Sequence, residues 1–215
     1  STPTGGGLHL ITDFEHDDQG RITQQLGPSH EIDIDGTATD IRRATWTVYK
    51  DADNEIWTGQ GYQKLSDSSF TLINPVDIKA YDKNRNLTGE TRAARSSTSG
   101  KLQPTDSFPQ SSWLRWTSHQ YTECCKLIST RVYHDIPSSG TGSSGTNYDQ
   151  TDFGYDLRDR RNRVESPGGT ITFTVFDVRS LPIKVFVGTD DTGATDTDPT
   201  GGGAAGNNMV QVTGS

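Results

Sequence analysis

The chain has 215 residues, of which 29% are apolar, and its formal net charge is −8. This length suits a single β-sandwich domain, although the low apolar content restricts the core to short runs. No apolar run reaches the length of a membrane span, and two cysteines are too few for a small fold held together by disulfides.

The charged residues are unevenly chosen. The chain has 22 Asp but 6 Glu, and 13 Arg but 7 Lys. Asp suits turns, whereas the scarcity of Lys indicates a surface that stays soluble when salt screens its charges. This composition favours a halophilic origin, while β-rich secreted proteins share much of it.

Alternation of apolar and polar residues predicts strands along most of the chain after a flexible arm at 1–7. The clearest run is 170–177, in which Ile171, Phe173 and Val175 share one face opposite threonines. The expected strands cover 8–14, the surroundings of Ile32 and Ile34, 44–50, 55–62, 69–73, 77–81, 113–119, 121–134, 170–177, 181–187 and 209–212.

Helical periodicity is nearly absent, and the best short helix candidate is 89–95, which lacks a coherent apolar stripe. The pattern therefore predicts an all-β protein, an antiparallel β-sandwich that forms a single jelly roll with long loops. We expect one domain over 8–215, with a Gly-rich link at 201–206 before the last strand. Two similar segments, 48–59 and 80–89, each read as a hairpin with a polar turn.

Three segments lack any pattern, namely 88–112, 137–169 and 189–207. Loops of this length are uncommon in a compact domain unless they bind something or pack against a partner. The last of them contains the best metal candidate, a calcium site formed by carboxylates that are closely spaced in the chain. Its expected ligands are Asp190, Asp191, Asp196 and Asp198, and hydrated surface turns are the alternative.

Two further features are candidates for an interface. The basic run of Arg158, Arg160, Arg161 and Arg163 is interrupted by Asp159 in an acidic protein, which favours pairing with an acidic neighbour over contact with nucleic acid. Cys124 and Cys125 are adjacent, so on a strand they would point to opposite faces. This predicts one buried and one partly exposed free thiol, or a bond from one of them to another subunit.

The sequence offers little for catalysis. The letters of 140–145 match a dinucleotide-binding loop, but no amphipathic helix follows them, so a surface loop is expected. No nucleophile elbow or Walker loop occurs, and we expect no catalytic residues and no cofactor apart from calcium. A β-rich hydrolase using scattered carboxylates stays a third alternative. The tryptophans at 46, 57, 113 and 116 would fill the core or form a sugar platform.

Taken as a whole, the chain resembles in style the single jelly-roll major capsid proteins of haloarchaeal icosahedral viruses with an internal membrane. The features that carry this resemblance are the start at 1–7, the strand runs ending at 170–187, the Gly/Ser/Thr loops and the excess of Asp over Glu. The resemblance implies a structural subunit of the virion that assembles in high salt with copies of itself and a second capsid protein. Such a shell lies over a lipid layer and requires no nucleic acid contact from the subunit.

The rival interpretation is an extracellular β-sandwich adhesin or carbohydrate-binding module. It would use the exposed tryptophans and a calcium loop, and the glycosylation triplet at 86–88 fits such exposure. Exposed, coplanar tryptophans would favour this interpretation. Loops that become ordered only against neighbouring copies would favour the capsid.

Overall fold

The computed structural model describes residues 10–214, so the arm expected at 1–7 lies outside the described part. Over this part the protein is all-β and its strands pair in antiparallel fashion, which confirms the predicted class. The only helix there is a three-residue 3₁₀ turn, η1 (Gln110–Ser112), so no described helix could cross a membrane. The described residues group into two compact units, which divide between Trp116 and Thr117.

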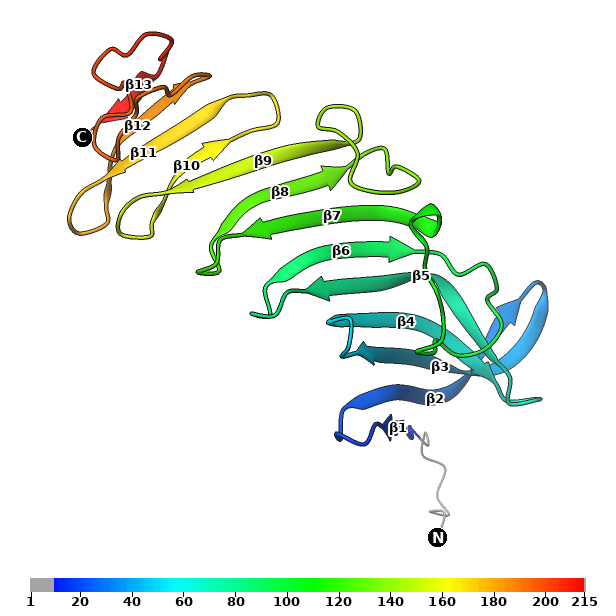
Figure 1. Ribbon diagram of the computed structural model, residues 1–215. Coiled ribbons are helices and arrows are strands. Elements are labelled where there is room, and N and C mark those ends of the chain that lie inside the picture. Colours follow the sequence, from blue (N-terminus) through cyan, green and yellow to red (C-terminus); the bar gives the residue numbers. More distant parts are fainter. Residues whose placement is uncertain (1–9, 215) are drawn as a thin grey trace. The chain divides into compact units, whose positions relative to one another are not determined.

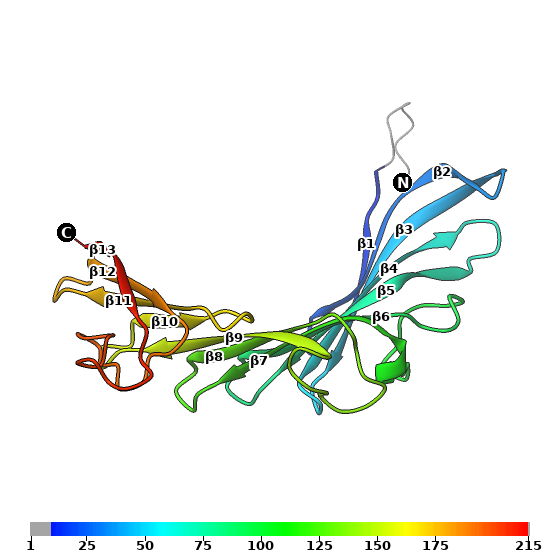
Figure 2. The same cartoon turned by 90° about the horizontal axis from the view of Figure 1, so that it is seen from above.

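The first unit is a meander in which each strand pairs with the next one along the chain (Figure 1). The β2–β3 hairpin is the longest, and its tip extends past the residues that pair with β1 and β4 (Figure 2). The strands are β1 (Asp13–His16), β2 (Ile22–Ile34), β3 (Thr37–Lys50), β4 (Glu55–Lys64), β5 (Phe70–Tyr81) and β6 (Leu87–Ala93), and β7 (Trp113–Tyr121) begins in this unit.

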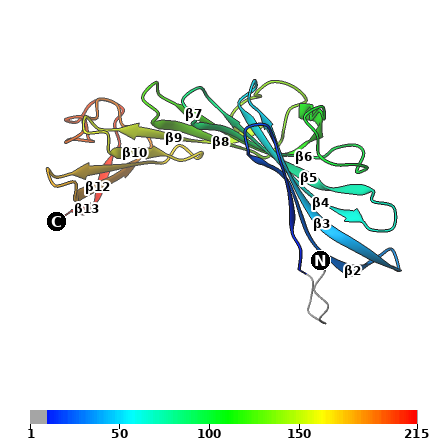
Figure 3. The same ribbon diagram turned by 90° about the horizontal axis from the view of Figure 1, so that it is seen from below.

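The second unit continues the same pattern from the end of β7 (Figures 1 and 3). Two of its strands lie within 137–169, where the sequence predicted a loop, because their alternation is masked by polar and charged residues. Its strands are β8 (Leu127–Tyr133), β9 (Tyr148–Tyr155), β10 (Arg161–Glu165), β11 (Ile171–Phe176), β12 (Pro182–Gly188) and β13 (Val210–Gly214).

The strand order limits how far the predicted fold is confirmed. A jelly roll is made of Greek keys, which bring strands that are not consecutive in the chain side by side. Within each unit the described strands have only their chain neighbours as partners, so the pairings show an antiparallel meander, and the jelly roll stays a prediction. The single domain expected over 8–215 likewise stays a prediction.

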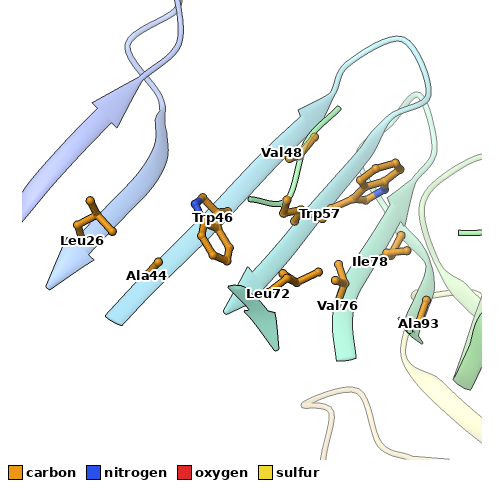
Figure 4. Packing of buried hydrophobic residues seen from close by; sticks show 10 residues of the cluster. Leu26, Ala44, Trp46, Val48, Trp57, Leu72, Val76, Ile78 and Ala93 are labelled. Atoms are coloured by element: carbon orange, nitrogen blue, oxygen red, sulfur yellow. The ribbon is translucent and has the colours of Figure 1, made fainter. Parts of the chain in front are cut away.

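The core of the first unit lies on one face of its sheet (Figure 4). Alternation along β3 places Trp46 and Val48 on this face, and Trp57 of β4 lies opposite Val48. Gly61 leaves the space for the Trp46 ring, because a Cβ at this position would lie 2.7 Å from the indole. The buried set is Leu26, Ala44, Trp46, Val48, Trp57, Leu72, Val76, Ile78, Ala93 and Leu102.

Residues 94–112, here called the strap, cover part of this core. The predicted helix at 89–95 is wrong, because Thr91 and Ala93 are buried, Arg92 is exposed, and β6 pairs along β5 as a strand. The strap then follows β6 and contributes Leu102, which is buried among the core residues. Phe108 of the strap meets the Trp57 ring edge-on, with the ring centroids 5.2 Å apart. The segment predicted as a patternless loop is therefore part of the core of its own unit.

Arg95 holds the strap in its folded path. Its guanidinium pairs with Asp106 at 2.9 Å, and both side chains are largely buried. It also donates hydrogen bonds to four strap carbonyls, those of Ser97, Ser99, Gly100 and Lys101. A guanidinium presents five N–H donors in a fixed fork, so one side chain can satisfy several backbone acceptors of a loop.

The second unit has a smaller apolar cluster. Ile171, Phe173 and Val175 are buried on one face of β11, as the alternation of 170–177 predicted. They pack with Phe186 of β12 and with Met209, which lies just before β13. The expected link at 201–206 is not an open tether, because its turns pack against residues 192–193.

Six hairpin connections share one turn design, here called the capped turn. In each, the N–H of the first residue donates to the carbonyl of the fifth, and the N–H of the fourth donates to the carbonyl of the first. The fourth residue has a positive φ of 64–77°. The first residue is Asp, Thr or Ser, and its side-chain oxygen accepts further N–H groups of the turn. These turns are 17–21, 82–86, 122–126, 156–160, 166–170 and 177–181.

The capped turn explains why the chain reverses direction at these six connections. A short polar side chain at the first position satisfies N–H groups that a tight turn leaves without backbone partners. The positive φ at the fourth position produces a bulge, and five of the six connections show a register shift beside the turn. The hairpin interpretation of 48–59 and 80–89 is confirmed, although the turn after β3 is a variant of the design.

Candidate functional site

An open cleft lies among the described residues of the first unit. It has a volume of about 530 Å³ and lies where the β1–β2, β3–β4 and β5–β6 hairpins turn. Its lining combines aromatic, amide, carboxylate and guanidinium groups. The lining residues are Gln19, Arg21, Tyr49, Asp51, Asn54, Glu55, Ile56, Tyr81, Asp82 and Arg85.

The apolar part of the cleft comes from the face of the sheet opposite to the core. Val48 and Trp57 point into the core, so their chain neighbours Tyr49 and Ile56 point to the other face and lie directly opposite each other. Tyr81 follows from β5, and its N–H donates to the carbonyl of Asn54 at 2.9 Å. All three lining side chains are half-buried.

Arg21 forms one wall of the cleft and ties two hairpins together. Its Nη1 and Nη2 donate to the two carboxylate oxygens of Asp51, each at 2.8 Å, and its Nε donates to Asp17 at 2.7 Å. The guanidinium also lies 4.0 Å from the centre of the Tyr49 ring. The hydrogen bonds from Arg21 hold the pKa of Asp51 below its ordinary value, so this wall is fully ionised at neutral pH.

The rim of the cleft carries both donors and acceptors. Asn54 and Arg85 have positive φ values of 54° and 65°, and both side chains are exposed. Glu55 accepts a hydrogen bond from the indole Nε1 of Trp57 at 2.8 Å, which fixes one carboxylate oxygen. Asp82 caps its own turn, and the side-chain hydrogen bond from Asn86 together with backbone N–H donors lowers its pKa.

The structure does not gather the predicted calcium ligands into one site. Asp190 and Asp198 each cap a local turn, and Asp191 pairs with Arg163 at 2.5 Å. Asp196 accepts from Asn162 and from the N–H of Leu157. Each carboxylate therefore has its own protein partner. No group of three or more His, Cys, Asp or Glu residues within 10–214 is arranged to hold a metal ion.

The arginine run divides into inward and outward members. Arg160 pairs with the buried Asp156 at 2.6 Å, and Arg163 pairs with Asp191 and Glu165. Arg158 and Arg161 are exposed; Arg158 donates to a backbone carbonyl and Arg161 lies 5.2 Å from an aromatic ring centre. An interface role stays a prediction for these two, whereas Arg160 and Arg163 already have partners within their own unit.

The two cysteines lie in a capped turn and not on a strand. Both are exposed free thiols, so the expectation that one is buried is wrong. The predicted extended run 121–134 breaks at this turn, where Cys125 takes the fourth position with a φ of 66°. Bonding of either thiol to another subunit stays a prediction.

The tryptophans do not build a flat platform. Trp46 and Trp57 are buried, which confirms the core interpretation for these two. Trp113 and Trp116 meet edge-on, with an angle of 69° between the ring planes. A sugar ring stacks on an exposed flat face, and this pair does not present two coplanar faces.

The sequence analysis did not predict the cleft, because its residues come from three turns that are distant in the sequence.

Sequence comparisons supply no relatives from which to carry over a function. No protein-family model matches the chain, and no curated protein matches it. The candidate site is therefore defined by the geometry of the first unit alone.

Proposed function

We propose that the protein is a structural protein, a β-scaffold built from repeated hairpins that assembles with copies of itself or with other β proteins. The observation that carries this proposal is the capped turn, which recurs at six connections in both units. Repeated supersecondary units whose members contact only their chain neighbours are typical of scaffolds that present an extended surface.

The sheet edges support a controlled rather than an unlimited association. The edge strand β1 carries Asp13, Glu15 and His16, and β13 pairs with β12 through a register shift. Charges and bulges on edge strands disfavour runaway strand pairing. Contacts with partners would therefore form through turns and faces, where Arg158, Leu157 and Val178 are exposed at adjacent hairpins.

The finer form of the proposal is a viral capsid subunit that assembles into an icosahedral shell in high salt, together with a second capsid protein. Its support is the all-β antiparallel fold, the acid excess and the many Arg–Asp pairs. The single jelly roll belongs to this finer form and would require Greek-key neighbours that the meander alone does not provide.

The alternative is an extracellular adhesin or carbohydrate-binding module. One observation favours it, the open cleft with tyrosines and mixed polar groups in the first unit. The tryptophan platform has no support, because Trp46 and Trp57 are buried and Trp113 meets Trp116 edge-on. The calcium loop has no support either, because the described carboxylates do not gather into a metal site.

The test is the particle mass and fold of the full chain, measured by light scattering and circular dichroism from low to multimolar salt. We expect a β spectrum throughout and a rise in particle mass with salt. Arg158→Ala combined with Arg161→Ala should reduce that rise, whereas Arg92→Ala, which replaces an exposed arginine of the first unit, should not. A monomer at every salt concentration would contradict the proposal.

A further inference from the structure

We propose that the cleft of the first unit binds a neutral saccharide of one or two rings. This inference is independent of the scaffold proposal, because it concerns only residues within one unit.

The size of the cleft sets the size of the ligand. Small-molecule sites commonly have volumes of about 300–1,000 Å³, and the cleft, at about 530 Å³, falls in the lower half of this range. The cleft is also open to solvent, which suits one end of a glycan chain as well as a free sugar. One or two sugar rings match this volume.

The walls of the cleft offer an apolar surface on which a sugar ring can pack. The C–H face of a sugar ring is apolar and packs on aromatic or aliphatic side chains, here Tyr49, Tyr81 and Ile56. Arg21 already lies against one face of the Tyr49 ring, which holds that ring in place before any ligand arrives. An ordered wall lowers the conformational entropy that binding would cost.

The charges of the cleft favour a neutral ligand. Arg21 is matched by Asp17 and Asp51, so its guanidinium is not available to neutralise an anion. The remaining groups include the amides of Gln19 and Asn54, which both donate and accept, and the guanidinium of Arg85, which donates. A hydroxyl group both donates and accepts, and planar amide, carboxylate and guanidinium groups can each engage two neighbouring hydroxyls. Polyhydroxylated ligands match this mixture better than ions of either sign.

The positions of Asn54 and Arg85 provide a clean test. Both residues have positive φ values, which glycine adopts without strain, so replacing either by glycine removes a rim side chain without opposing the backbone. The matched control is Ser180→Gly, the same change at the fourth position of a capped turn in the second unit. Asn54→Gly, Arg85→Gly and Ser180→Gly should all fold.

The experiment is saturation-transfer-difference NMR of the full chain with a panel of neutral, acidic and amino mono- and disaccharides, followed by calorimetric titration. We expect at least one neutral sugar to bind, Asn54→Gly and Arg85→Gly to weaken it about tenfold or more, and Ser180→Gly to leave it unchanged.

Three results would overturn the inference. One is the absence of binding by any neutral sugar at millimolar concentrations. Another is binding that both rim variants leave unaffected, which would place the sugar elsewhere. The third is a clear preference for acidic sugars that Arg85→Gly abolishes, because the cleft would then be an anion site.

Discussion

The two units use the same hairpin design but stabilise it differently. The first unit buries ten residues in its main apolar cluster, including two tryptophans, and covers them with the strap. The second unit buries five residues in its cluster. Around them lie the buried polar side chains of Asp156 and Asn162, which pair with Arg160 and Asp196.

This difference shows that a lean sequence can stabilise a β-meander in two ways. Burial of apolar surface stabilises a fold in proportion to the area removed from water. The large tryptophan rings therefore contribute the most per residue to the stability of the first unit. A satisfied polar network contributes less per group, but losing one partner leaves the other desolvated and unpaired. The following predictions test whether the two units respond to mutation as this comparison requires.

The largest effect is expected from Trp46→Ala in the first unit. Trp46 is only 2% exposed, and its indole Nε1 donates to the buried Gln24 at 2.9 Å. Loss of the ring should lower the free energy of unfolding by about 3–5 kcal/mol, since it leaves a cavity and an unpaired amide oxygen. Urea denaturation measures this change, and Leu114→Ala, at an exposed position, is the control. A loss of less than about 1 kcal/mol would contradict the assigned core.

The next effect is expected from Arg95→Ala, which removes the centre of the strap. The lost pair with Asp106 and the four lost carbonyl contacts should cost about 2–3 kcal/mol, because hydrogen bonds to charged groups are stronger than neutral ones. Protection of the strap amides in hydrogen exchange should fall with it. Arg92→Ala, an exposed neighbour paired with Asp77, should change neither quantity much.

In the second unit, Asp156→Asn tests the polar network. Burial raises the pKa of Asp156, but the N–H donors of Arg160 and Arg158 and the Arg160 guanidinium outweigh it and bring the pKa below its ordinary value. The carboxylate therefore stabilises the fold above the unfolded-state pKa of about 4, and this contribution disappears as the pH falls through the lower folded-state value.

We expect Asp156→Asn to cost about 1–2 kcal/mol at pH 7 and to cost progressively less below about pH 4. Denaturation of both proteins across this pH range measures the difference. A difference that stays constant with pH would show that the charge of Asp156 contributes nothing, and that the substitution acts through packing alone.

The smallest effect concerns the fourth position of the capped turn. Ser180 adopts a φ of 66°, and this conformation costs a residue with a side chain about 1–2 kcal/mol. Glycine avoids that strain, but its more flexible unfolded chain lowers the gain in stability by roughly 0.5–1 kcal/mol. Ser180→Gly should therefore stabilise the protein by about 0.5–1 kcal/mol, measured by thermal unfolding. The reverse change at the equivalent site, Gly20→Ala, should destabilise it.

Some of this structure could be predicted from the sequence for clear physical reasons. Alternation at 170–177 placed Ile171, Phe173 and Val175 on the buried face, since side chains along a strand point alternately to opposite faces. The same rule failed at 148–165, where β9 and β10 carry mostly polar and charged residues. Their strand conformation depends on pairing with neighbours, which local alternation does not record.

The candidate site could not be predicted because it is assembled from three turns. A signal was nevertheless present, as an aromatic or histidine ring precedes Asp or Thr at five of the six capped turns. Such a recurrence indicates repeats before any strand is assigned. The cleft itself depends on strand register, which brings Tyr49 opposite Ile56, and register follows from the whole sheet.

The capped turn separates the stability of each hairpin from the chemistry of its tip. The first and fourth residues make the bonds and the conformation that fix the turn, while the second and third residues project outward, as the 97% exposed Leu157 does. The same turn conformation therefore accommodates different dipeptides at its second and third positions, such as Asp18-Gln19, Glu123-Cys124 and Val178-Arg179. Evolution or protein engineering could substitute these dipeptides one by one, and so change the binding properties of the surface, while the sheet beneath them stays the same.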